Sequence, residues 1–202
     1  MIDKNSKYLI KKIVLAAGSS NRYGKENKLT QYINNKPVIN HLMDKLLSVY
    51  DATELLIVTG YQDKTIINLI NNPKIECVFN NDYKNGIGTS ISTGVKELGE
   101  NINGVMIIPA DMPIISKNDL IKLENKFLEF NCSKVIFPKY KSQIGNPVLL
   151  PRNYFNTLIS LKEDFGAKSQ IKKTDIVTVK TDIGTVFDID TISNLKTAKS
   201  IL

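Results

Sequence analysis

The sequence predicts a mostly parallel, doubly wound α/β sheet, and three observations lead to this prediction. Short apolar runs recur along the chain, and segments with apolar residues at helical spacing separate them. The first run, Lys12–Ala16, is apolar at nearly every position, which is typical of a strand buried on both faces. Alternating strands and helices form right-handed crossovers, and such sheets bind ligands at the carboxyl ends of their strands.

The remaining elements follow in order from local signals. Residues 17–36 are expected to form a loop with a short strand at 29–33, and Pro37 suits the first position of a helix. Ser116 resembles a helix N-cap, with Asp119 as a capping-box acid. We further expect strands at 54–59, 75–79, 105–108 and 135–138, helices at 63–70, 89–98 and 117–130, a loop leading into a strand at 143–150, short helices at 151–161 and 166–172, a strand at 175–179 and a final helix after Thr191. The chain shows no repeat, low-complexity tract or linker, so we expect one domain over residues 1–202.

Composition limits the class of protein. The chain has 202 residues, 42% of them hydrophobic, and a net charge of +7. Its positive charges are scattered, which favours a solvated surface or a small polyanionic substrate over a nucleic-acid face. No apolar run is long enough to cross a membrane, and the first residues lack an apolar signal segment. Cys77 and Cys132 stand far apart beside apolar runs, as core thiols in a reducing cytoplasm would. The single histidine, His41, falls off its helix's apolar stripe, so we expect a surface imidazole with no catalytic role.

The loop after the first strand has the composition of a phosphate site. The strand opens at Gly18 into small, polar and cationic residues, and Lys28 follows. Backbone amides, hydroxyls and a fixed positive charge suit bound phosphates. The loop is neither a Walker A sequence nor a dinucleotide fingerprint, and Ile91 replaces the third glycine of a motif beginning Gly86-Ile-Gly88. From composition alone, an ordinary surface loop remains the favoured reading.

Carboxylates follow at two further places. Asp111 comes just after an apolar strand, where an aspartate can bind a hard divalent cation or make a local turn bond. Asp188 and Asp190 lie two residues apart, so they would share one face of an extended segment. Asp190 could instead cap the final helix. A glycosidase carboxylate pair is a rival interpretation of these acids.

Six motifs together resemble a known family. They are Leu15-Ala-Ala-Gly-Ser-Ser-Asn-Arg-Tyr-Gly24 with Lys28, Asn80 with Gly86-Ile-Gly-Thr-Ser90, Pro109-Ala-Asp-Met-Pro113, Gly145-Asn-Pro147, Asp164-Phe-Gly-Ala-Lys168 and Asp188-Ile-Asp-Thr191. Each is weak alone, but their order resembles that of the MobA-like nucleotidyltransferases over residues 12 to 200. The branch most similar to this chain is that of the molybdenum cofactor cytidylyltransferases (MocA type).

The resemblance implies a Rossmann-like three-layer fold of the nucleotide-diphospho-sugar transferase type. It implies transfer of CMP from CTP to molybdopterin cofactor, release of pyrophosphate and a requirement for Mg²⁺. A molybdenum hydroxylase or its insertion chaperone would be the protein partner, with no nucleic acid and no membrane involved. The implied roles are catalysis by Arg22, Lys28 and Asp111; nucleotide binding by Ala16, Ala17, Gly18, Ser19, Ser20, Arg22, Lys28, Asn80, Gly86 and Ser90; metal binding by Asp111 and Asp190; and acceptor binding by Gly145, Asn146, Pro147, Gly166 and Lys168. Ala16-Ala17 stands where the guanylyl branch usually has Ala-Gly, which favours cytosine.

Some positions depart from the family pattern. Three residues separate Gly24 from Lys28 where two are commoner, Asn146 stands where many cytidylyltransferases have His, and Glu163 and Lys168 replace the usual Gly and Arg. These departures leave other hypotheses open: transfer to another phosphorylated acceptor such as a sugar phosphate, use of GTP, or a non-catalytic accessory protein that carries cofactor to a molybdenum hydroxylase.

Overall fold

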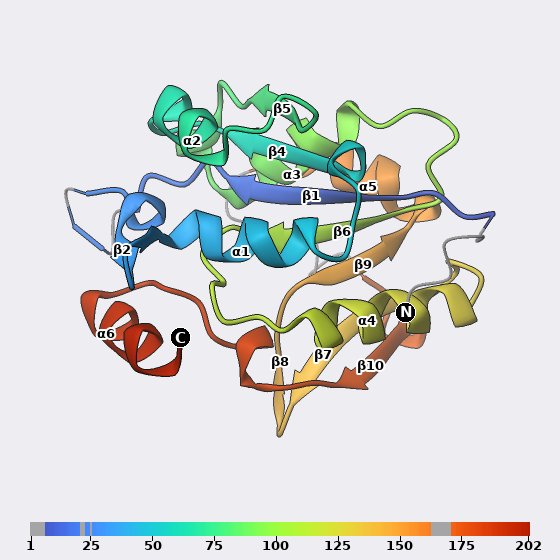
Figure 1. Cartoon of the computed structure of the whole chain (residues 1–202). Helices are drawn as coiled ribbons and strands as arrows, with labels where there is room; N and C mark the ends of the chain where they lie inside the picture. Colours follow the sequence, from blue (N-terminus) through green and yellow to red (C-terminus); the bar gives the residue numbers. More distant parts are fainter. Residues whose placement is uncertain (1–6, 21–22, 25, 163–170) are drawn as a thin grey trace.

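A central eight-stranded sheet organises the molecule (Figure 1). The computed structural model describes residues 7–20, 23–24, 26–162 and 171–202. The strands are β1 (Ile10–Ala16), β4 (Leu55–Thr59), β5 (Glu76–Phe79), β6 (Gly104–Pro109), β7 (Val135–Tyr140), β8 (Gln143–Ile144), β9 (Val148–Pro151) and β10 (Ile176–Lys180). Their order is β10-β7-β9-β6-β1-β4-β5, and β8 pairs with β7. A separate two-stranded sheet joins β2 (Tyr32–Ile33) to β3 (Lys36–Pro37).

The strand order places a topological switch point between β1 and β6. β1 pairs in parallel with β4 on one side and with β6 on the other. The chain runs outward from β1 through β4 to β5, and then returns to add β6 on the other side of β1. Loops leaving β1 and β6 therefore diverge, which opens a crevice at the carboxyl ends of these two strands. We call this side of the molecule the carboxyl edge.

β9 is the exception to parallel order, because it pairs antiparallel with both β6 and β7. The prediction of a mostly parallel sheet is confirmed, with this inserted strand as the detail that the sequence pattern did not show. The short β7–β8 hairpin supplies the reversal, since β8 pairs antiparallel with β7 before the chain enters β9.

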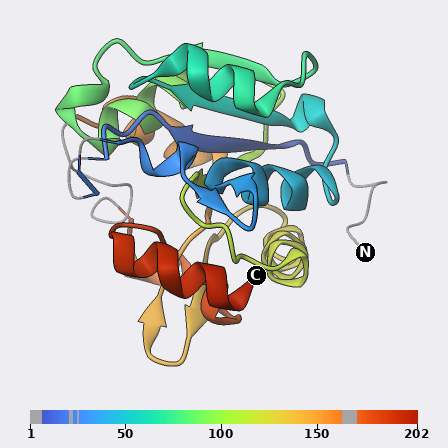
Figure 2. The ribbon, with the colours of Figure 1, turned by 60° about the vertical axis from the view of Figure 1, so that its left-hand side comes forward.

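Helices cover both faces of the sheet and make three layers (Figures 1 and 2). One face packs against α1 (Val38–Leu47), α2 (Asp63–Ile70), α4 (Lys117–Glu129) and α6 (Ile192–Ile201). The other face packs against α3 (Ile87–Lys96) and α5 (Phe155–Ile159). Successive side chains of β1 point to opposite faces of the sheet and so pack in both hydrophobic cores. Val14 and Ala16 face the layer that contains α1, and Ile13 faces the layer that contains α3.

Most expected elements are present, with shifts at their ends. The helix at 63–70 has the expected bounds, and Ser116 caps α4 by accepting a hydrogen bond from the backbone amide of Asp119 at 3.0 Å. The expected strand at 29–33 is a 3-10 turn (Lys28–Thr30) followed by the two residues of β2. Asn27 causes this difference, because its side chain accepts from the amide of Leu29 and caps the turn. The helix expected at 166–172 falls largely outside the described residues.

Three smaller expectations also have outcomes. The side chain of Thr191, and not that of Asp190, caps α6. It forms a capping box with Asn194, in which each side chain accepts a hydrogen bond from the backbone amide of the other residue. His41 is half-buried, and its Nε2 lies 2.9 Å from the carbonyl oxygen of Ile33. Cys132 is buried as expected, but Cys77 is exposed on the edge strand β5, so the interpretation of both as core thiols is wrong for Cys77. Among the described residues, no helix is long and apolar enough to cross a membrane.

β1 also carries a fully buried charge. The side chain of Lys12 has no solvent exposure, and its ammonium lies 3.1 Å from Glu124 Oε1 and 2.9 Å from Glu54 Oε1. It also donates to the carbonyl oxygen of Ile10 and lies 4.2 Å from the centre of the Tyr50 ring. Burial raises the pKa of Glu124, although Lys12 opposes this shift. The cluster ties α4 to the strand that leads into the carboxyl edge.

Candidate active site

The loop that leaves β1 forms one wall of the site. It is held at its base because the carbonyl oxygen of Ala17 accepts from the amide of Tyr61, and that of Leu15 accepts from the amide of Ala110. Ser20 has a φ of 57°, in the left-handed region, and its carbonyl oxygen accepts from the amide of Tyr23 at 2.8 Å. Backbone amides in a loop that leaves the carboxyl end of a central strand are suited to binding an anion.

A second wall brings three carboxylates together. Asp111 follows β6, and its carbonyl oxygen accepts from the amide of Ile189 at 3.0 Å. Ile189 is fully buried in the core, so its neighbours Asp188 and Asp190 turn toward Asp111. One oxygen from each of these three aspartates lies within 4.8 Å of the other two. A chain segment near the C-terminus thereby completes a cluster that begins at the end of a central strand.

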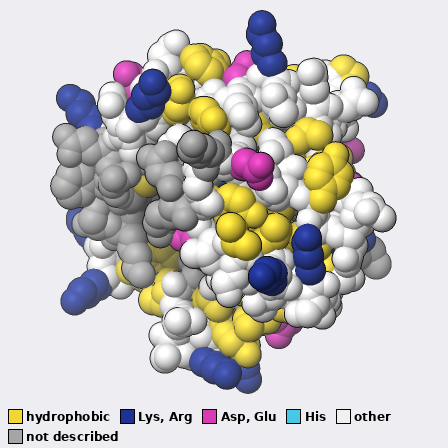
Figure 3. All heavy atoms as spheres, turned by 90° about the vertical axis from the view of Figure 1, so that its left-hand side faces the viewer, with side chains coloured by type: hydrophobic (Ala, Val, Ile, Leu, Met, Phe, Trp, Pro, Cys, Tyr) yellow, Lys and Arg dark blue, Asp and Glu magenta, His cyan; other side chains and the backbone are white. Residues whose placement is uncertain are grey.

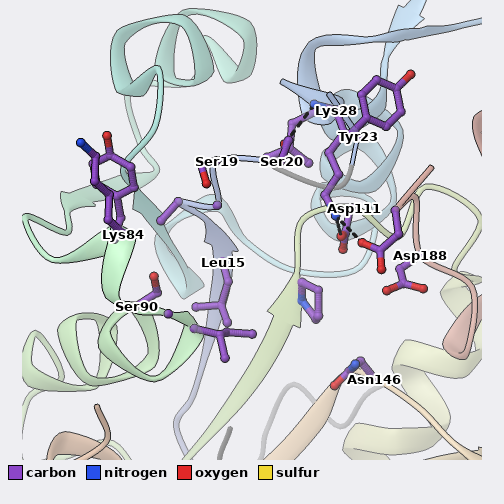
Figure 4. Close-up of a pocket in the computed structure, with 18 residues that line it drawn as sticks. Leu15, Ser19, Ser20, Tyr23, Lys28, Lys84, Ser90, Asp111, Asn146 and Asp188 are labelled. Carbon is purple, nitrogen blue, oxygen red and sulfur yellow. Dashed lines mark hydrogen bonds and ion pairs between the residues drawn. The ribbon is translucent and has the colours of Figure 1, made fainter. Parts of the chain in front are cut away.

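Lys28 connects the two walls. Its ammonium lies 2.5 Å from Asp111 Oδ2 and 2.9 Å from Asp190 Oδ1 (Figure 4). Its backbone amide donates to the hydroxyl of Ser20 at 3.2 Å. This bond fixes the lysine to the loop that leaves β1, which we call the phosphate-type loop. All three charged side chains are largely buried, with exposed fractions of 16% for Lys28, 14% for Asp111 and 23% for Asp190. These ion pairs are therefore poorly screened by solvent.

The charges in this cluster shift one another's protonation. Burial alone lowers the pKa of Lys28, but Asp111 and Asp190 outweigh it, and the pKa is raised. Burial raises the pKa of the Asp188 carboxyl, and its negative neighbours Asp111 and Asp190 raise it further. Three acids with one lysine leave an excess of negative charge. That excess attracts a further cation.

A hollow of about 460 Å³ lies between the walls, and we call it the main hollow. Lys84 and Ser90 lie at one end and Lys28, Asp111 and Asp188 at the other, with Ser19 between them (Figure 4). The side chains and backbone that line it are Leu15, Ala17, Gly18, Ser19, Ser20, Tyr23, Lys28, Leu29, Tyr83, Lys84, Gly86, Ile87, Ser90, Pro109, Asp111, Asn146, Asp188 and Asp190. Its volume is typical of a site for a small organic ligand.

The N-terminus of α3 points into the main hollow. Gly86 precedes the helix with a φ of 102°, a backbone conformation that residues other than glycine rarely adopt. Gly86, Ile87 and Ser90 line the hollow, so the positive end of the helix dipole faces its contents. Asn80 lies behind this turn and donates to the hydroxyls of Thr89 at 2.9 Å and Ser90 at 3.0 Å. It orients the turn from within the protein.

A smaller hollow of about 280 Å³ adjoins the main one, and we call it the side hollow. It is lined by Met112, Gln143, Ile144, Gly145, Asn146, Thr185, Val186, Phe187 and Asp188. Asn146 and Asp188 belong to both hollows, so a ligand in one can meet a ligand in the other. Gly145 allows the close approach of two segments here, because a Cβ at this position would lie 1.9 Å from the carbonyl oxygen of Thr185.

The face that contains the site carries scattered positive charge. Figure 3 looks onto the carboxyl edge, and the Lys and Arg side chains that it shows are spread over this face without forming one continuous patch. Within the main hollow, the described cations are Lys28 and Lys84, one at each end. This arrangement suits a compact anion held inside the hollow.

The structure places many of the residues expected at the site around the main hollow. Others lie elsewhere. Ala16 is fully buried, and its side chain packs in the core on the α1 side, so we correct its expected contact with nucleotide. Asn80, Gly145 and Pro147 do not line the main hollow, although Gly145 lines the side hollow. Arg22, Gly166 and Lys168 lie outside the described residues.

Several residues that line the main hollow were missed by sequence reasoning, among them four with polar side chains. Asp188 was noticed as the partner of Asp190 but was not expected to contribute to a metal site, although its spacing of two residues was the available signal. Tyr23, Tyr83 and Lys84 also line the main hollow. They lie in loops, where no periodicity shows the direction of a side chain.

The fold and the arrangement of this site are consistent with a match to a known family. The chain belongs to the family of the MobA-like NTP transferase domain, whose model matches residues 12–178. The family expected from the sequence motifs is thereby confirmed.

Relatives with assigned names differ in their substrates. The chain is 29% identical over 136 residues to a probable molybdenum cofactor guanylyltransferase from Thermococcus sibiricus, covering 67% of this chain and 65% of that protein. It is 30% identical over 124 residues to the bifunctional protein GlmU of Wigglesworthia glossinidia brevipalpis, covering 60% of this chain and 27% of that protein. The chain thus spans less than two thirds of the length of either relative.

Solved structures confirm the fold. Rv0371c from Mycobacterium tuberculosis superposes with a TM-score of 0.80 at 18% identity, covering 96% of this chain and 99% of that one. A crystal structure of Rv0371C as a complex with manganese gives a TM-score of 0.77 at 16% identity, covering 96% of this chain and 100% of that one. Molybdopterin-guanine dinucleotide biosynthesis protein A from Archaeoglobus fulgidus gives 0.64 at 18% identity, covering 95% and 97%.

Proposed function

We propose that this nucleotidyltransferase moves CMP from CTP to the phosphate of molybdopterin cofactor and releases pyrophosphate. The observation that carries the proposal is the cluster of Asp111, Asp188 and Asp190, in which Lys28 bridges the first and the last. The cluster lies at one end of a hollow that the loop after β1 and the N-terminus of α3 also line. The family match supports the reaction class. The choice of CTP and of the acceptor rests on the arguments below.

The three carboxylates suit a hard divalent cation, for which we propose Mg²⁺. Besides the cluster's negative excess, Asp111 Oδ1 is buried and has no hydrogen-bond partner in the described structure. A buried carboxylate oxygen without a partner is costly unless a ligand satisfies it. We propose Asp111 and Asp190 as ligands, with Asp188 as a third. When bound, the ion would neutralise charge on the nucleotide phosphates.

The protein's part in the chemistry is alignment. An oxygen of the acceptor phosphate is already anionic near neutral pH, so it needs no general base. It bonds to the α-phosphorus of the nucleotide, and the bond from that phosphorus to the oxygen bridging to the β-phosphate breaks, so that pyrophosphate leaves. Backbone amides of residues 17–20, together with Arg22 and Lys28, would hold the departing phosphates. His41, half-buried and paired with a backbone carbonyl, has no role in this scheme.

Cytosine is proposed as the base because of Ala17. Ala17 is one of the residues that line the main hollow, whereas the guanylyl branch usually has glycine at this place. An added methyl group narrows the hollow and favours the smaller pyrimidine ring. Guanylyl transfer is the competing candidate, and the name of the Thermococcus sibiricus relative favours it. Sugar-phosphate acceptors are a further alternative.

The side hollow supports an acceptor with a largely uncharged body. Met112, Ile144, Val186 and Phe187 give it apolar walls, while Gln143 and Asn146 provide amide groups. It contains no Lys or Arg among the described residues that line it. Thr185 and Asp188 add further polar groups, and a pterin ring, whose edges donate and accept hydrogen bonds, is compatible with this mixed lining. Its phosphate would point toward Asn146, at the junction with the main hollow.

A transfer assay tests the proposal. Purified protein is incubated with molybdopterin cofactor, Mg²⁺ and CTP, GTP or ATP, and both pyrophosphate and the nucleotide-bearing product are measured. We expect CTP to be used most efficiently, and a preference for GTP would overturn the cytidylyl assignment. Asp111→Asn, which keeps the side chain's size, should lower turnover by roughly 100-fold or more if the carboxylate holds the ion. Asp182→Asn is the matched control, because Asp182 lines neither hollow, and its turnover should stay unchanged.

A further inference from the structure

Lys28 occupies the space between two of the proposed metal ligands. Its ammonium contacts Asp111 at 2.5 Å and Asp190 at 2.9 Å, and these oxygens are among the groups that would bind a cation. A divalent ion bound to carboxylates lies about 2.0–2.6 Å from their oxygens. A divalent ion held by the same aspartates would lie close to the ammonium, and the repulsion between these positive charges disfavours binding of the ion while the lysine stays in place.

The contacts of Lys28 hold it in this place. Its backbone is anchored to Ser20 through the amide-to-hydroxyl bond of 3.2 Å, and its side chain is largely buried. Withdrawal of the ammonium requires another negative group to receive it, since a buried charge without a partner is costly. The phosphate-type loop beside Ser20 is where an anionic group would lie. The lysine can therefore move from carboxylate to phosphate only when a phosphate is present.

We propose that Lys28 is an exchangeable counter-ion that keeps divalent metal out of the carboxylate cluster until a nucleoside triphosphate arrives. The inference rests on the proposed function, because it takes the cluster to be the metal site. Nucleotide phosphates draw the ammonium away from Asp111 and Asp190, and the vacated carboxylates then accept the cation. The cation accordingly binds together with the nucleotide and not before it. Nucleotide and metal affinities are thus coupled through one side chain.

Binding of Mn²⁺, followed by the electron paramagnetic resonance signal of the free ion, tests this exchange. Wild-type protein alone should bind Mn²⁺ weakly, and added CTP should strengthen binding markedly beyond the Mn²⁺ that the same CTP binds without protein. Lys28→Met removes the charge but keeps an unbranched side chain, so Mn²⁺ should bind this variant roughly tenfold or more tightly without nucleotide. CTP should then change its Mn²⁺ affinity much less than in the wild type.

Three companion variants make the result specific. Lys28→Arg keeps a positive charge, so its Mn²⁺ affinity without nucleotide should stay as weak as that of the wild type. Lys126→Met removes a surface lysine paired with Glu129 at 2.7 Å and controls for net charge, so it should leave Mn²⁺ affinity unchanged. Lys28→Met/Asp111→Asn should lose the gained affinity, which locates the ion at the cluster. Circular dichroism spectra confirm that each variant is folded.

The outcomes separate this inference from the proposed function. If wild type and Lys28→Met bind Mn²⁺ equally well without nucleotide, the counter-ion role is wrong, while the metal site itself stands. If both bind Mn²⁺ only with CTP and to the same extent, the counter-ion role is also wrong. If neither binds Mn²⁺ with or without nucleotide, the metal site and the inference fail together.

Discussion

Lys12→Met tests how a fully buried charge is tolerated in the strand that leads to the site. Methionine keeps the unbranched stem of Lys12 but removes its charge, leaving Glu124 with an exposed side-chain fraction of 6% and no cation beside it. Glu54 matters less, because its side chain is 39% exposed and water can replace the lysine. The loss of stability should therefore arise mainly from Glu124.

Protonation of Glu124 limits this loss. Starting from its ordinary pKa of 4.5, protonating the carboxyl at pH 7 costs about 3.4 kcal/mol, and at pH 5 about 0.7 kcal/mol. The variant also avoids burying the lysine, which offsets part of the loss. We expect Lys12→Met to lower the free energy of unfolding by about 2–3 kcal/mol at pH 7 and by less than about 1 kcal/mol at pH 5.

The pH dependence has a definite sign. Burial raises the pKa of Glu124 in the folded protein, and loss of Lys12 raises it further. The folded state then holds a proton that the unfolded state has released, so stability falls as pH rises from 4.5 toward the folded-state pKa. This fall should be steeper in the variant than in the wild type.

Urea unfolding at pH 5 and pH 7, followed by circular dichroism, measures these differences. Lys12→Met/Glu124→Gln removes both charges and should recover most of the stability, with little dependence on pH. Lys11→Met is the control, because Lys11 pairs with a half-exposed Glu76 and should contribute less than about 1 kcal/mol. A loss for Lys12→Met below about 0.5 kcal/mol at pH 7, or equal losses at the two pH values, would refute the reasoning.

Three further changes test the site and the packing around it. Ala17→Gly removes a methyl group from a residue that lines the main hollow and should raise the kcat/KM ratio of GTP to CTP roughly tenfold or more, measured by pyrophosphate release. An unchanged ratio would show that this residue does not select the base. Gly145→Ala should lower the free energy of unfolding by about 1–3 kcal/mol in a denaturant titration, because its Cβ would lie 1.9 Å from a carbonyl oxygen. The control Gly99→Ala meets only a flexible side chain and should cost less. Equal losses for the two variants would show that Gly145 is not required by a steric clash. A thiol reagent at pH 8 should label exposed Cys77 in native protein but reach Cys132 only after denaturation, because that thiol is buried and burial raises its pKa to about 12; prompt labelling of both would contradict the burial.

Much of the fold followed from local patterns. Continuous apolar runs predicted β1, β4 and β6 because these strands are buried on both faces, and no neighbour alters that requirement. Ser116 was found as an N-cap because capping depends on only a few neighbouring residues. The antiparallel insertion of β9 was not predicted, since an apolar run shows that a strand is buried but not the direction in which it pairs.

The site was predictable only in part. Lys28, Asp111 and Asp190 were named from motifs, and the rule for parallel strands predicted a ligand site at the carboxyl ends of the strands. The missed Tyr23, Tyr83 and Lys84 lie in loops, where the direction of a side chain depends on turn geometry. Ala16 was wrongly included because a two-residue motif does not show which of its side chains faces the core.

By itself, the sequence determined the strand that ends at Ala16, the polar loop beyond it and the presence of acids after β6 and before α6. These features depend on residue type and on neighbours a few positions away. Only the tertiary structure decided that Lys28 bridges Asp111 and Asp190, because Lys28 and Asp190 are 162 residues apart in the sequence. That contact depends on the buried Ile189, which packs in the core and brings both flanking aspartates to the end of β6. Contacts between such distant segments are set by core packing, and no local pattern encodes them.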